Sequence, residues 1–550
     1  MAKSPSITIF ERDASSYPVT TSETILAIVG YATNGAMAKP TLVTSRNEFI
    51  KTFGIPTEDA PWSHLAAYRA FNQGNQIYFT RIGDTASGDT GAVKAQRVIY
   101  NREEEWNAGD SLSAVQIEAK NFGSDNNNLS LVISFETDPV LSTNVYKIEI
   151  YYKSSLRETF SNLSMTSGDT NFFETVINRD EDNGGSSLIT IDTYLGSGDS
   201  ADSRLDFSGD STGKTYLIGD SDSANGDTYP FVDGDSWPMI GDTSYDFKAG
   251  LDGVITGDSD SANLHAEVLT TNSDLANIEL YDYHVLITPD NGNSVTTDAA
   301  VALAEYRKDF IYIADPPQSL TYSQVIAWHN GSGQGRSTAI NSSYAATYWP
   351  WLKDYNINTG NYIWCPPSVF IAEKLMEVDR LYGPWYAVAG DVRGRITASD
   401  YEASPSLAQR DLMYGGLNAV NPIVYFNQKG LEIFGQKTLL RRTTSLNRLN
   451  VRRMVIYVKK LIKRSMDGIV FEPHVADSWT KATNIINSIL EPVRQGGGLE
   501  DYRVIIDSTT NTADLIAQNI MKGIIKLLPV GTIEIIELSI QLFNPGSSIE

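Results

Sequence analysis

The first part of the chain alternates short apolar runs with segments in which apolar residues recur at helical spacing. The runs over 25–29 and 77–81 predict strands, because each is short and rich in β-branched or aromatic residues. Between them, the spacing over 45–53 and 62–72 predicts two helices. The pattern therefore predicts a mixed α/β segment over residues 21–88.

Period-two patterning replaces helical spacing from about residue 89 onward. Large apolar residues alternate with other residues over 129–135 and again over 146–152, which is typical of strands with one buried face. Gly-Asp pairs recur at irregular spacing through 180–265, and Gly-Asp is a common turn sequence between short strands. We predict an inserted β-rich domain over 89–265, whose acidic part over 180–265 faces outward.

Strand and helix signals alternate again between residues 266 and 428. Apolar runs over 284–287 and 310–314 predict strands, and the segments 295–308 and 322–329 predict helices. Strands that alternate with helices favour a parallel sheet covered by helices.

Residues 429–550 predict a compact α+β domain. The expected elements are helices over 451–464, 478–490 and 512–528 and strands over 468–471, 502–506 and 532–543.

Two short alternating segments lie at the ends of the sequence, in the arm over 1–20 and in the final strand. A lone strand buries little apolar surface, so each needs a host sheet, either in its own chain or in a neighbouring subunit. Fraying is the alternative for the first segment. The apolar positions are Ile7 and Ile9 in the first segment and Ile536, Leu538, Ile540 and Leu542 in the second.

The composition is acidic, which narrows the choice of partners. The 550 residues include 67 acidic and 43 basic ones, a formal net charge of −24, and such a surface repels nucleic acid and anionic membranes. No signal peptide is apparent, and no apolar run approaches the roughly 20 residues that span a bilayer. One cysteine, Cys365, cannot form an internal disulfide and favours assembly in a reducing cytoplasm.

Known catalytic and ligand-binding motifs are absent or incomplete. The stretch 209–215 resembles a phosphate-binding loop, but three residues separate its glycines where the motif has four, and a strand signal follows. The pair Asp282 and His284 is a weak hydrolase constellation without a nucleophile elbow. We therefore predict no catalytic, cofactor or metal site. Calcium binding by the Gly-Asp region remains an open alternative.

A basic helix stands out against the acidic background. Between residues 435 and 470 there are ten Lys or Arg and a single Asp. The apolar residues of 451–462 fall on one side of the helix, and the basic residues fall on the other. The basic side is either a solvated face or a surface that docks onto an acidic partner. Its residues are Arg452, Arg453, Lys459, Lys460, Lys463 and Arg464.

Several stretches, taken in order along the chain, resemble the contractile tail sheath family of bacteriophages and related injection systems. They are 25–30 with 41–45 and 49–54, 121–129, 383–390 with 393–394, 417–425, and 449–453 through 470–473. The segment 180–265 is the least similar to the family.

The resemblance implies a multi-domain α/β and β fold. It implies a subtilisin-like α/β core without a catalytic triad, an inserted β-rich domain facing outward, and an α+β C-terminal domain. The N-terminal segment, residues 21–88, is expected to pack with that C-terminal domain. The arms, residues 1–20 and the terminal strand, are expected to add strands to sheets of neighbouring subunits.

The implied function is structural. Subunits are expected to form stacked hexameric rings around a tail tube, with baseplate and tail terminator proteins as further partners. Assembly in the host cytoplasm, a location in the virion tail, and contraction that drives the tube through the host envelope during genome delivery are also implied. The basic helix is then a candidate for docking on the tube. The alternatives are the sheath of a phage-derived injection system and a calcium- or glycan-binding adhesin.

Overall fold

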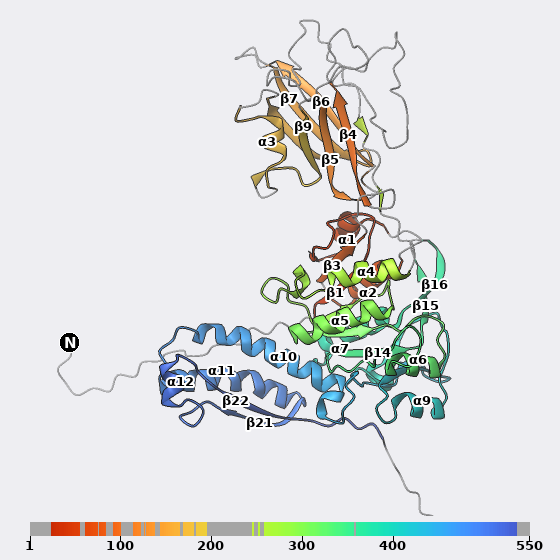
Figure 1. The fold of residues 1–550 in the computed structure, drawn as a ribbon, viewed down its shortest axis with the longest axis vertical. Helices are drawn as coiled ribbons and strands as arrows, with labels where there is room; N and C mark the ends of the chain where they lie inside the picture. Colours follow the sequence, from red (N-terminus) through yellow and green to blue (C-terminus); the bar gives the residue numbers. More distant parts are fainter. Residues whose placement is uncertain are drawn as a thin grey trace, which may run out of the picture.

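The computed structural model describes most of the chain (Figure 1). The described residues are 24–55, 61–74, 76–83, 92–100, 114–122, 126, 128–137, 144–164, 169–180, 183–194, 245–246, 251–252, 258–356 and 359–535. Both proposed strand arms, at Ile7 and Ile9 and at 536–542, lie outside these residues, as does most of the acidic segment 180–265.

A nine-stranded sheet organises the centre of the molecule, in the order β17-β20-β19-β14-β13-β12-β1-β3-β2. The six strands from β19 to β3 are parallel to their neighbours, and the outer strands are antiparallel. The bounds are β1 (Leu26–Tyr31), β2 (Thr41–Val43), β3 (Ile77–Ile82), β12 (Val285–Ile287), β13 (Ile311–Ala314), β14 (Ala345–Trp349), β17 (Arg395–Ile396), β19 (Val420–Phe426) and β20 (Gly430–Ile433).

Helices pack around this sheet, which explains why its inner strands are apolar throughout. Every residue of β12 and β13 is buried, as expected for parallel strands covered on both faces. The helices are α1 (Arg46–Phe53), α2 (Pro61–Ala70), α4 (Asp258–Val268), α5 (Ser294–Arg307), α6 (Tyr322–Asn330), α7 (Pro367–Leu381), α8 (Gly390–Arg393) and α9 (Leu407–Tyr414), with the 3-10 turn η3 (Asp274–Ala276). A small sheet, β16-β15-β18, lies beside them, with β15 (Leu352–Asn356), β16 (Asn361–Cys365) and β18 (Asp400–Tyr401).

The segment 24–83 belongs to this central sheet, which corrects the expectation that residues 21–88 pack with the C-terminal domain. Strand β1 pairs with β12 on one side and with β3 on the other. Residues 26–29 are fully apolar and buried, and such a strand needs a partner and a covering layer on every side. The interior of the parallel sheet provides these, although about 250 residues separate β1 from β12 in sequence.

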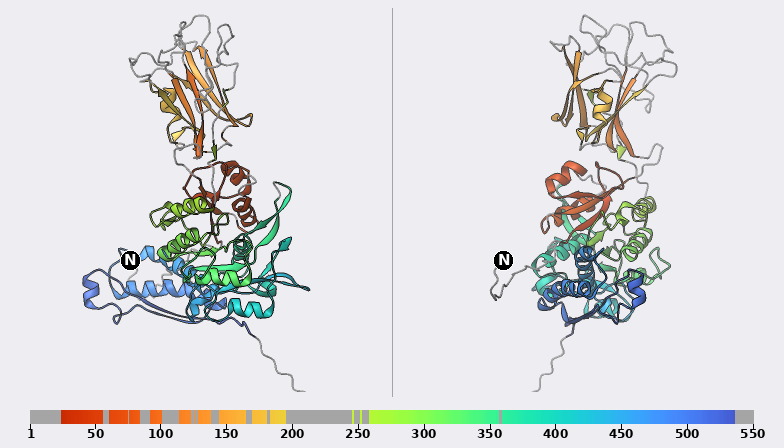
Figure 2. Two further views of the ribbon diagram at one scale, coloured as in Figure 1. Left: turned by 45° about the vertical axis from the view of Figure 1, so that its right-hand side comes forward. Right: turned by 90° about the vertical axis from the view of Figure 1, so that its left-hand side faces the viewer.

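The β-rich module is a sandwich of two four-stranded sheets, β10-β6-β7-β8 and β11-β4-β5-β9, at one end of the molecule (Figures 1 and 2). In β6 and β7, Leu129, Leu131, Ile148 and Ile150 are buried in its core, in agreement with the predicted alternation. The elements are β4 (Ala92–Tyr100), β5 (Ala114–Phe122), β6 (Leu129–Thr137), β7 (Asn144–Tyr152), β8 (Ser155–Leu163), α3 (Phe173–Ile177), β9 (Ile189–Tyr194), β10 (Tyr245–Asp246) and β11 (Leu251–Asp252).

The C-terminal module lies at the opposite end, beside the lower part of the central domain (Figure 1). It consists of η4 (Ser445–Asn447), α10 (Leu449–Met466), η5 (Asp467–Ile469), α11 (Ala476–Gln495), β21 (Leu499–Ile505), α12 (Ala513–Ala517) and β22 (Ile524–Pro529). The first two predicted helices and the strand over 502–506 are confirmed.

Two sequence predictions in this module are wrong. The segment 468–471 is a turn between two helices and not a strand. Of the predicted final strand 532–543, residues 532–535 form no strand, and the rest lies outside the described residues. The expected helix over 512–528 divides into the short helix α12 and the strand β22. Short apolar runs such as 524–528 fit either a helix or a strand, and here pairing with β21 decides between them.

Candidate functional site

Helix α10 connects the C-terminal module to the central domain through two buried faces. One face is apolar and packs against α11 and β21, with Met454, Val458, Ile486 and Leu490 in a common cluster. The opposite face carries the basic residues that the sequence singles out, and most of them meet acidic or polar groups of the central domain.

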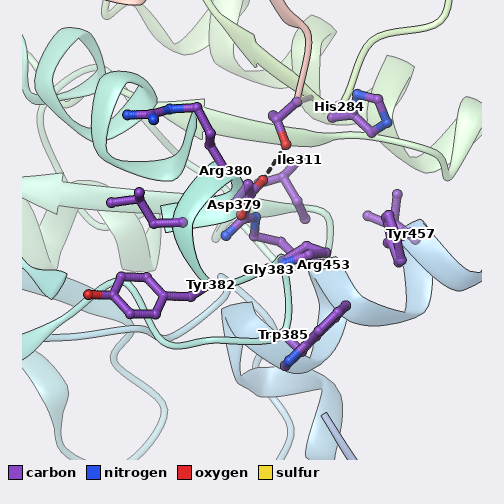
Figure 3. A pocket seen from close by; sticks show the side chains of 13 residues that line it. His284, Ile311, Asp379, Arg380, Tyr382, Gly383, Trp385, Arg453 and Tyr457 are labelled. Atoms are coloured by element: carbon purple, nitrogen blue, oxygen red, sulfur yellow. Dashed lines mark hydrogen bonds and ion pairs between the residues drawn. The ribbon is translucent and has the colours of Figure 1, made fainter. Parts of the chain in front are cut away.

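Arg453 forms a buried ion pair with Asp379 of α7 (Figure 3). The side chains of Arg453 and Asp379 are only 5% and 4% exposed. Thr24, two residues before β1, donates its hydroxyl to Asp379 Oδ2, the oxygen that Arg453 also contacts. Burial raises the pKa of Asp379, although Arg453 and Thr24 act in the opposite direction. Three segments far apart in sequence therefore meet at one carboxylate.

A second cluster lies about two to three turns further along α10. Lys460 donates to Asp282 Oδ1 at 2.7 Å and to the Tyr283 carbonyl at 2.5 Å, and Asp309 Oδ2 lies 3.8 Å away. Arg464 pairs with the other oxygen of Asp282. Burial lowers the pKa of Lys460 to about 7. Because its side chain is 11% exposed and already paired with two carboxylates, this residue presents little positive charge to an outside partner.

Arg452 is buried, and no carboxylate of the described residues forms an ion pair with it. Its guanidinium stacks over the Tyr344 ring at 4.2 Å, and it donates to Ser343 and to the Tyr344 hydroxyl. Burial lowers its pKa. This contact adds a cation–π interaction to the junction.

The docking prediction therefore needs a correction. Arg452, Arg453, Lys460 and Arg464 bind groups of their own chain, so the acidic surface that this helix face meets is largely intramolecular. Two predicted docking residues remain exposed. Lys459 donates to the Lys308 carbonyl at 3.0 Å, and Lys463 lies one turn beyond it.

The partners of the basic helix were missed by sequence reasoning. Asp282 was considered only with His284, and Asp309 and Asp379 were not singled out. A single carboxylate close to the end of a strand or helix gives no periodic signal in the sequence. Only the fold determines which of these ends lie next to α10. The one signal in the sequence was the excess of positive charge over residues 435–470 of an otherwise acidic chain, which indicates that acidic partners exist but not where they lie.

A cavity of about 250 Å³ opens at the Arg453–Asp379 junction (Figure 3). Aromatic side chains of Trp385 and Tyr457 line it together with Tyr382 and Leu381 at the end of α7. Buried atoms of both members of the ion pair, Arg453 Nη1 and Asp379 Oδ1, have no hydrogen-bond partner in the described part of the chain.

The sheet β21-β22 leaves both of its outer edges open among the described residues. Tyr502, Val504, Ile525 and Leu527 cover the helices with one face of this sheet. On the other face, Ile524 and Leu528 are exposed. An isolated two-stranded sheet is marginally stable, and its free edges present unpaired backbone N–H and C=O groups.

The carboxyl ends of the parallel strands, where ligands commonly bind in α/β proteins, contain two buried carboxyl groups. Asp290 accepts hydrogen bonds from the backbone N–H groups of Tyr31 and Ser63, at 2.8 and 3.0 Å. Asp315 accepts one from the N–H of Ser368 at 2.9 Å. Burial raises the pKa of Asp290 to about 6 and that of Asp315 to about 7. Both groups therefore organise backbone at the sheet edge.

His284, the sequence's hydrolase candidate, has a structural role. Its Nδ1 accepts the backbone N–H of Ile25 at 3.2 Å, and burial lowers its pKa well below the usual value. In the described ranges, no group of three His, Cys, Asp or Glu side chains has the arrangement of a metal site. None of the described helices combines the length and apolar character needed to cross a membrane.

We expect Asp315→Asn to stabilise the protein at alkaline pH, because the raised pKa makes the native carboxyl costly to ionise. The carboxyl titrates near 3.9 when unfolded and near 7 when folded, so its stabilising contribution is complete below about pH 4 and lost as the pH rises through 7. Asparagine keeps an acceptor for Ser368 N–H. Urea unfolding should show a clearly larger gain at pH 8 than at pH 5, and an equal gain at both values would contradict this assignment.

Comparison with known proteins gives the decisive observation. No family model matches the chain. It is, however, 27% identical over 264 residues to the tail sheath protein of Vibrio phage KVP40 and 25% identical over 354 residues to that of Enterobacteria phage T4. The chain is similar in sequence to phage tail sheath proteins. The alignments cover 45% and 60% of this chain but only 39% and 52% of these relatives' lengths.

Solved sheath structures have the same fold as this chain. The sheath tail protein of Listeria innocua matches with a TM-score of 0.56 at 10% identity, over 93% of this chain and 92% of that one. The helical sheath of the anti-feeding prophage, solved in a contracted state, matches with a TM-score of 0.50 at 14% identity, over 98% and 99%. None of these relatives supports the adhesin alternative.

Proposed function

We propose that this chain is the sheath subunit of a contractile tail, a structural protein that polymerises around a tube and drives it by contraction. The observation that carries the proposal is the two-stranded sheet β21-β22 with two open edges, in a chain with alternating apolar segments at both ends of its sequence. Each open edge is suited to accept one such strand from a neighbouring subunit.

The proposed assembly is a helical stack of hexameric rings. Head-to-tail contacts that do not close produce helical polymers, and exchanged strands keep neighbours connected when the remaining contacts change. The proposed partners are the tube, the baseplate and the tail terminator, and the proposed location is the virion tail after assembly in the host cytoplasm. The sheath of a phage-derived injection system is the alternative within the same function.

The proposed mechanism is mechanical and requires no chemistry at the α/β core. We infer a subtilisin-like sheet without a catalytic triad, which agrees with the structural roles of His284 and Asp315 described above. Contraction draws on interface free energy stored at assembly, when subunits are held in a metastable extended state.

The experiment that tests the proposal is negative-stain microscopy of the purified chain, alone and with its tube protein. Tubular polymers of uniform diameter are expected. Persistent monomers at high concentration in both samples would refute the proposal.

The two exposed lysines provide a separate test of tube docking. We expect Lys459→Glu with Lys463→Glu to reduce co-sedimentation with tubes, because like charges then face an acidic tube surface. The matched control is Lys39→Glu with Lys51→Glu, two exposed residues of the central domain with the same change in net charge. Equal binding by both double variants would show that the lysines are a solvated face.

A further inference from the structure

The turn between α10 and α11 has an unusual residue at its most demanding position. Glu472 N–H donates to the Ile469 carbonyl at 3.1 Å, Val470 has φ −64° and ψ 133°, and Phe471 has φ +73°. These values define a type II turn, in which the third residue is usually glycine or asparagine. A bulky side chain in this left-handed conformation is strained.

Phe471 also places its whole side chain in solvent. It is the most exposed of the large apolar residues in the described part of the chain. Val470 is 59% exposed and Val475, four residues after Phe471, is 50% exposed. The backbone strain and the exposed ring both disfavour phenylalanine in the isolated subunit. Strain of this kind is commonly retained where the residue has a role in binding.

A cavity elsewhere on the same molecule suits a phenyl ring. The Trp385–Tyr457 cavity measures about 250 Å³, and a cavity of about 150 Å³ already holds a benzene molecule. Its aromatic walls favour edge-to-face contacts with an inserted ring. Arg453 Nη1, on a side chain that is 5% exposed, borders the cavity without a partner in the described residues (Figure 3).

Charge on the two surfaces is complementary. Glu472 follows Phe471 directly, and its carboxylate lies 3.8 Å from Lys481 Nζ in an exposed pair, which contributes little stability and can be exchanged for another partner. Arg380 and Arg453 both line the cavity, where Asp379 is the one acidic neighbour among its lining residues. An inserted Phe471 would bring the Glu472 carboxylate toward this basic side of the cavity.

A chain cannot fill its own cavity with its own Phe471. Arg453 lies in the first turns of α10 and Phe471 follows its last turn. The helix from Arg453 to Met466 rises about 20 Å, and it is fixed at its first end by the Asp379 ion pair. A Phe471 that fills this cavity must therefore belong to a second copy.

We propose that Phe471 of one subunit inserts into the Trp385–Tyr457 cavity of a neighbouring copy, with Glu472 beside Arg380 and Arg453. Two different surfaces of the same chain then meet, which is a heterologous contact that propagates along a polymer. The contact rests on the proposed polymerisation and adds a side-chain anchor to it, separate from the exchanged strands.

The first test replaces Phe471, which should stabilise the folded subunit and weaken assembly. Phe471→Gly and Phe471→Asn both relieve the left-handed strain, so the Tm of the unassembled subunit should equal or exceed that of the native chain. The same variants should raise the critical concentration for polymerisation about tenfold, as expected for loss of a buried aromatic anchor. Leu407→Ser, at an exposed residue of α9, is the control and should leave assembly unchanged.

The outcomes separate this contact from the proposed function. If the native chain never polymerises, the proposed function fails. If it polymerises and both Phe471 variants do so at the same concentration, only the proposed contact fails. A lowered Tm in both variants would show that Phe471 packs within its own chain, which also overturns the contact.

The second test identifies the occupant by crosslinking. Polymers formed from a mixture of Phe471→Cys and Leu381→Cys chains should give disulfide-linked pairs on mild oxidation, because Leu381 lies at the cavity and is exposed. Cys365 is buried, and burial raises the pKa of its thiol, so it should stay unreactive. Leu407→Cys in place of Leu381→Cys is the matched control.

One result would assign the cavity to a different occupant. If the Leu381→Cys thiol is protected from alkylation in the monomer and deletion of residues 1–23 exposes it, the chain's own N-terminal segment fills the cavity. Crosslinking no stronger than with Leu407→Cys would equally overturn the proposal.

Discussion

A chain that lacks residues 536–550 should fold normally and fail to form polymers. The deleted segment contains the alternation of Ile536, Leu538, Ile540 and Leu542, which lies outside the described residues. If this strand completes an open edge of a neighbour's β21-β22 sheet, its removal leaves that edge unpaired in every subunit. Each lost backbone hydrogen bond costs about 0.5–1.5 kcal/mol, so a strand of this length decides assembly.

The measurement combines negative-stain microscopy with near-UV circular dichroism. Microscopy should show no tubes, and the circular dichroism signal of the truncated subunit should match that of the native one. A full-length control, Leu538→Pro with Ile540→Pro, blocks strand pairing without changing chain length and should have the same effect. Tubes of normal length from either variant would contradict the strand-exchange mechanism. Loss of the circular dichroism signal would show that the strand pairs within its own chain.

The second large effect is expected at the junction of α10 with the central domain. Arg453→Met should reduce the free energy of unfolding by about 3–5 kcal/mol, the typical cost of leaving one member of a buried ion pair without its partner. Asp379 would remain buried with only Thr24 as a side-chain donor. Urea unfolding of the unassembled subunit measures the difference.

Two further variants show whether the cause is the uncompensated charge. Adding Asp379→Asn to Arg453→Met removes the unpaired carboxylate and should restore most of the loss. Lys463→Met changes an exposed residue of the same helix and should stay within about 0.5 kcal/mol of the native chain. The deficit of Arg453→Met should also shrink at low pH, where Asp379 takes up a proton. A deficit independent of pH, and unrelieved in the double variant, would argue for lost packing instead.

The junction has a consequence for the proposed contraction. Arg452, Arg453, Lys460 and Arg464 fix α10 to the central domain along most of its length. We therefore expect the C-terminal module and the central domain to move as one body, with the change confined to contacts between subunits and to the connecting arms. Crosslinks within a subunit between α7 and α10 should leave contraction intact.

Sequence patterning determined most of the individual elements. Residues 26–29, 285–287 and 311–314 are apolar without interruption, and this pattern identifies buried strands wherever they pair. Helix α10 was evident because charge and apolar character separate on its two sides. The absence of a complete catalytic or phosphate-binding motif was also readable from the residues. These signals are local, because each depends on neighbours within a few turns of the same segment.

Only the tertiary structure decided which surfaces these elements share. It placed β1 and β3 in the sheet with β12 and not beside the C-terminal module, and it turned 524–529 into a strand through pairing with β21. It also paired the basic face of α10 with Asp282, Asp309 and Asp379. The physical reason is the same in each case. Strand pairing and charge neutralisation join residues tens to hundreds of positions apart, and a pattern along the chain shows that a partner is needed without showing where that partner lies.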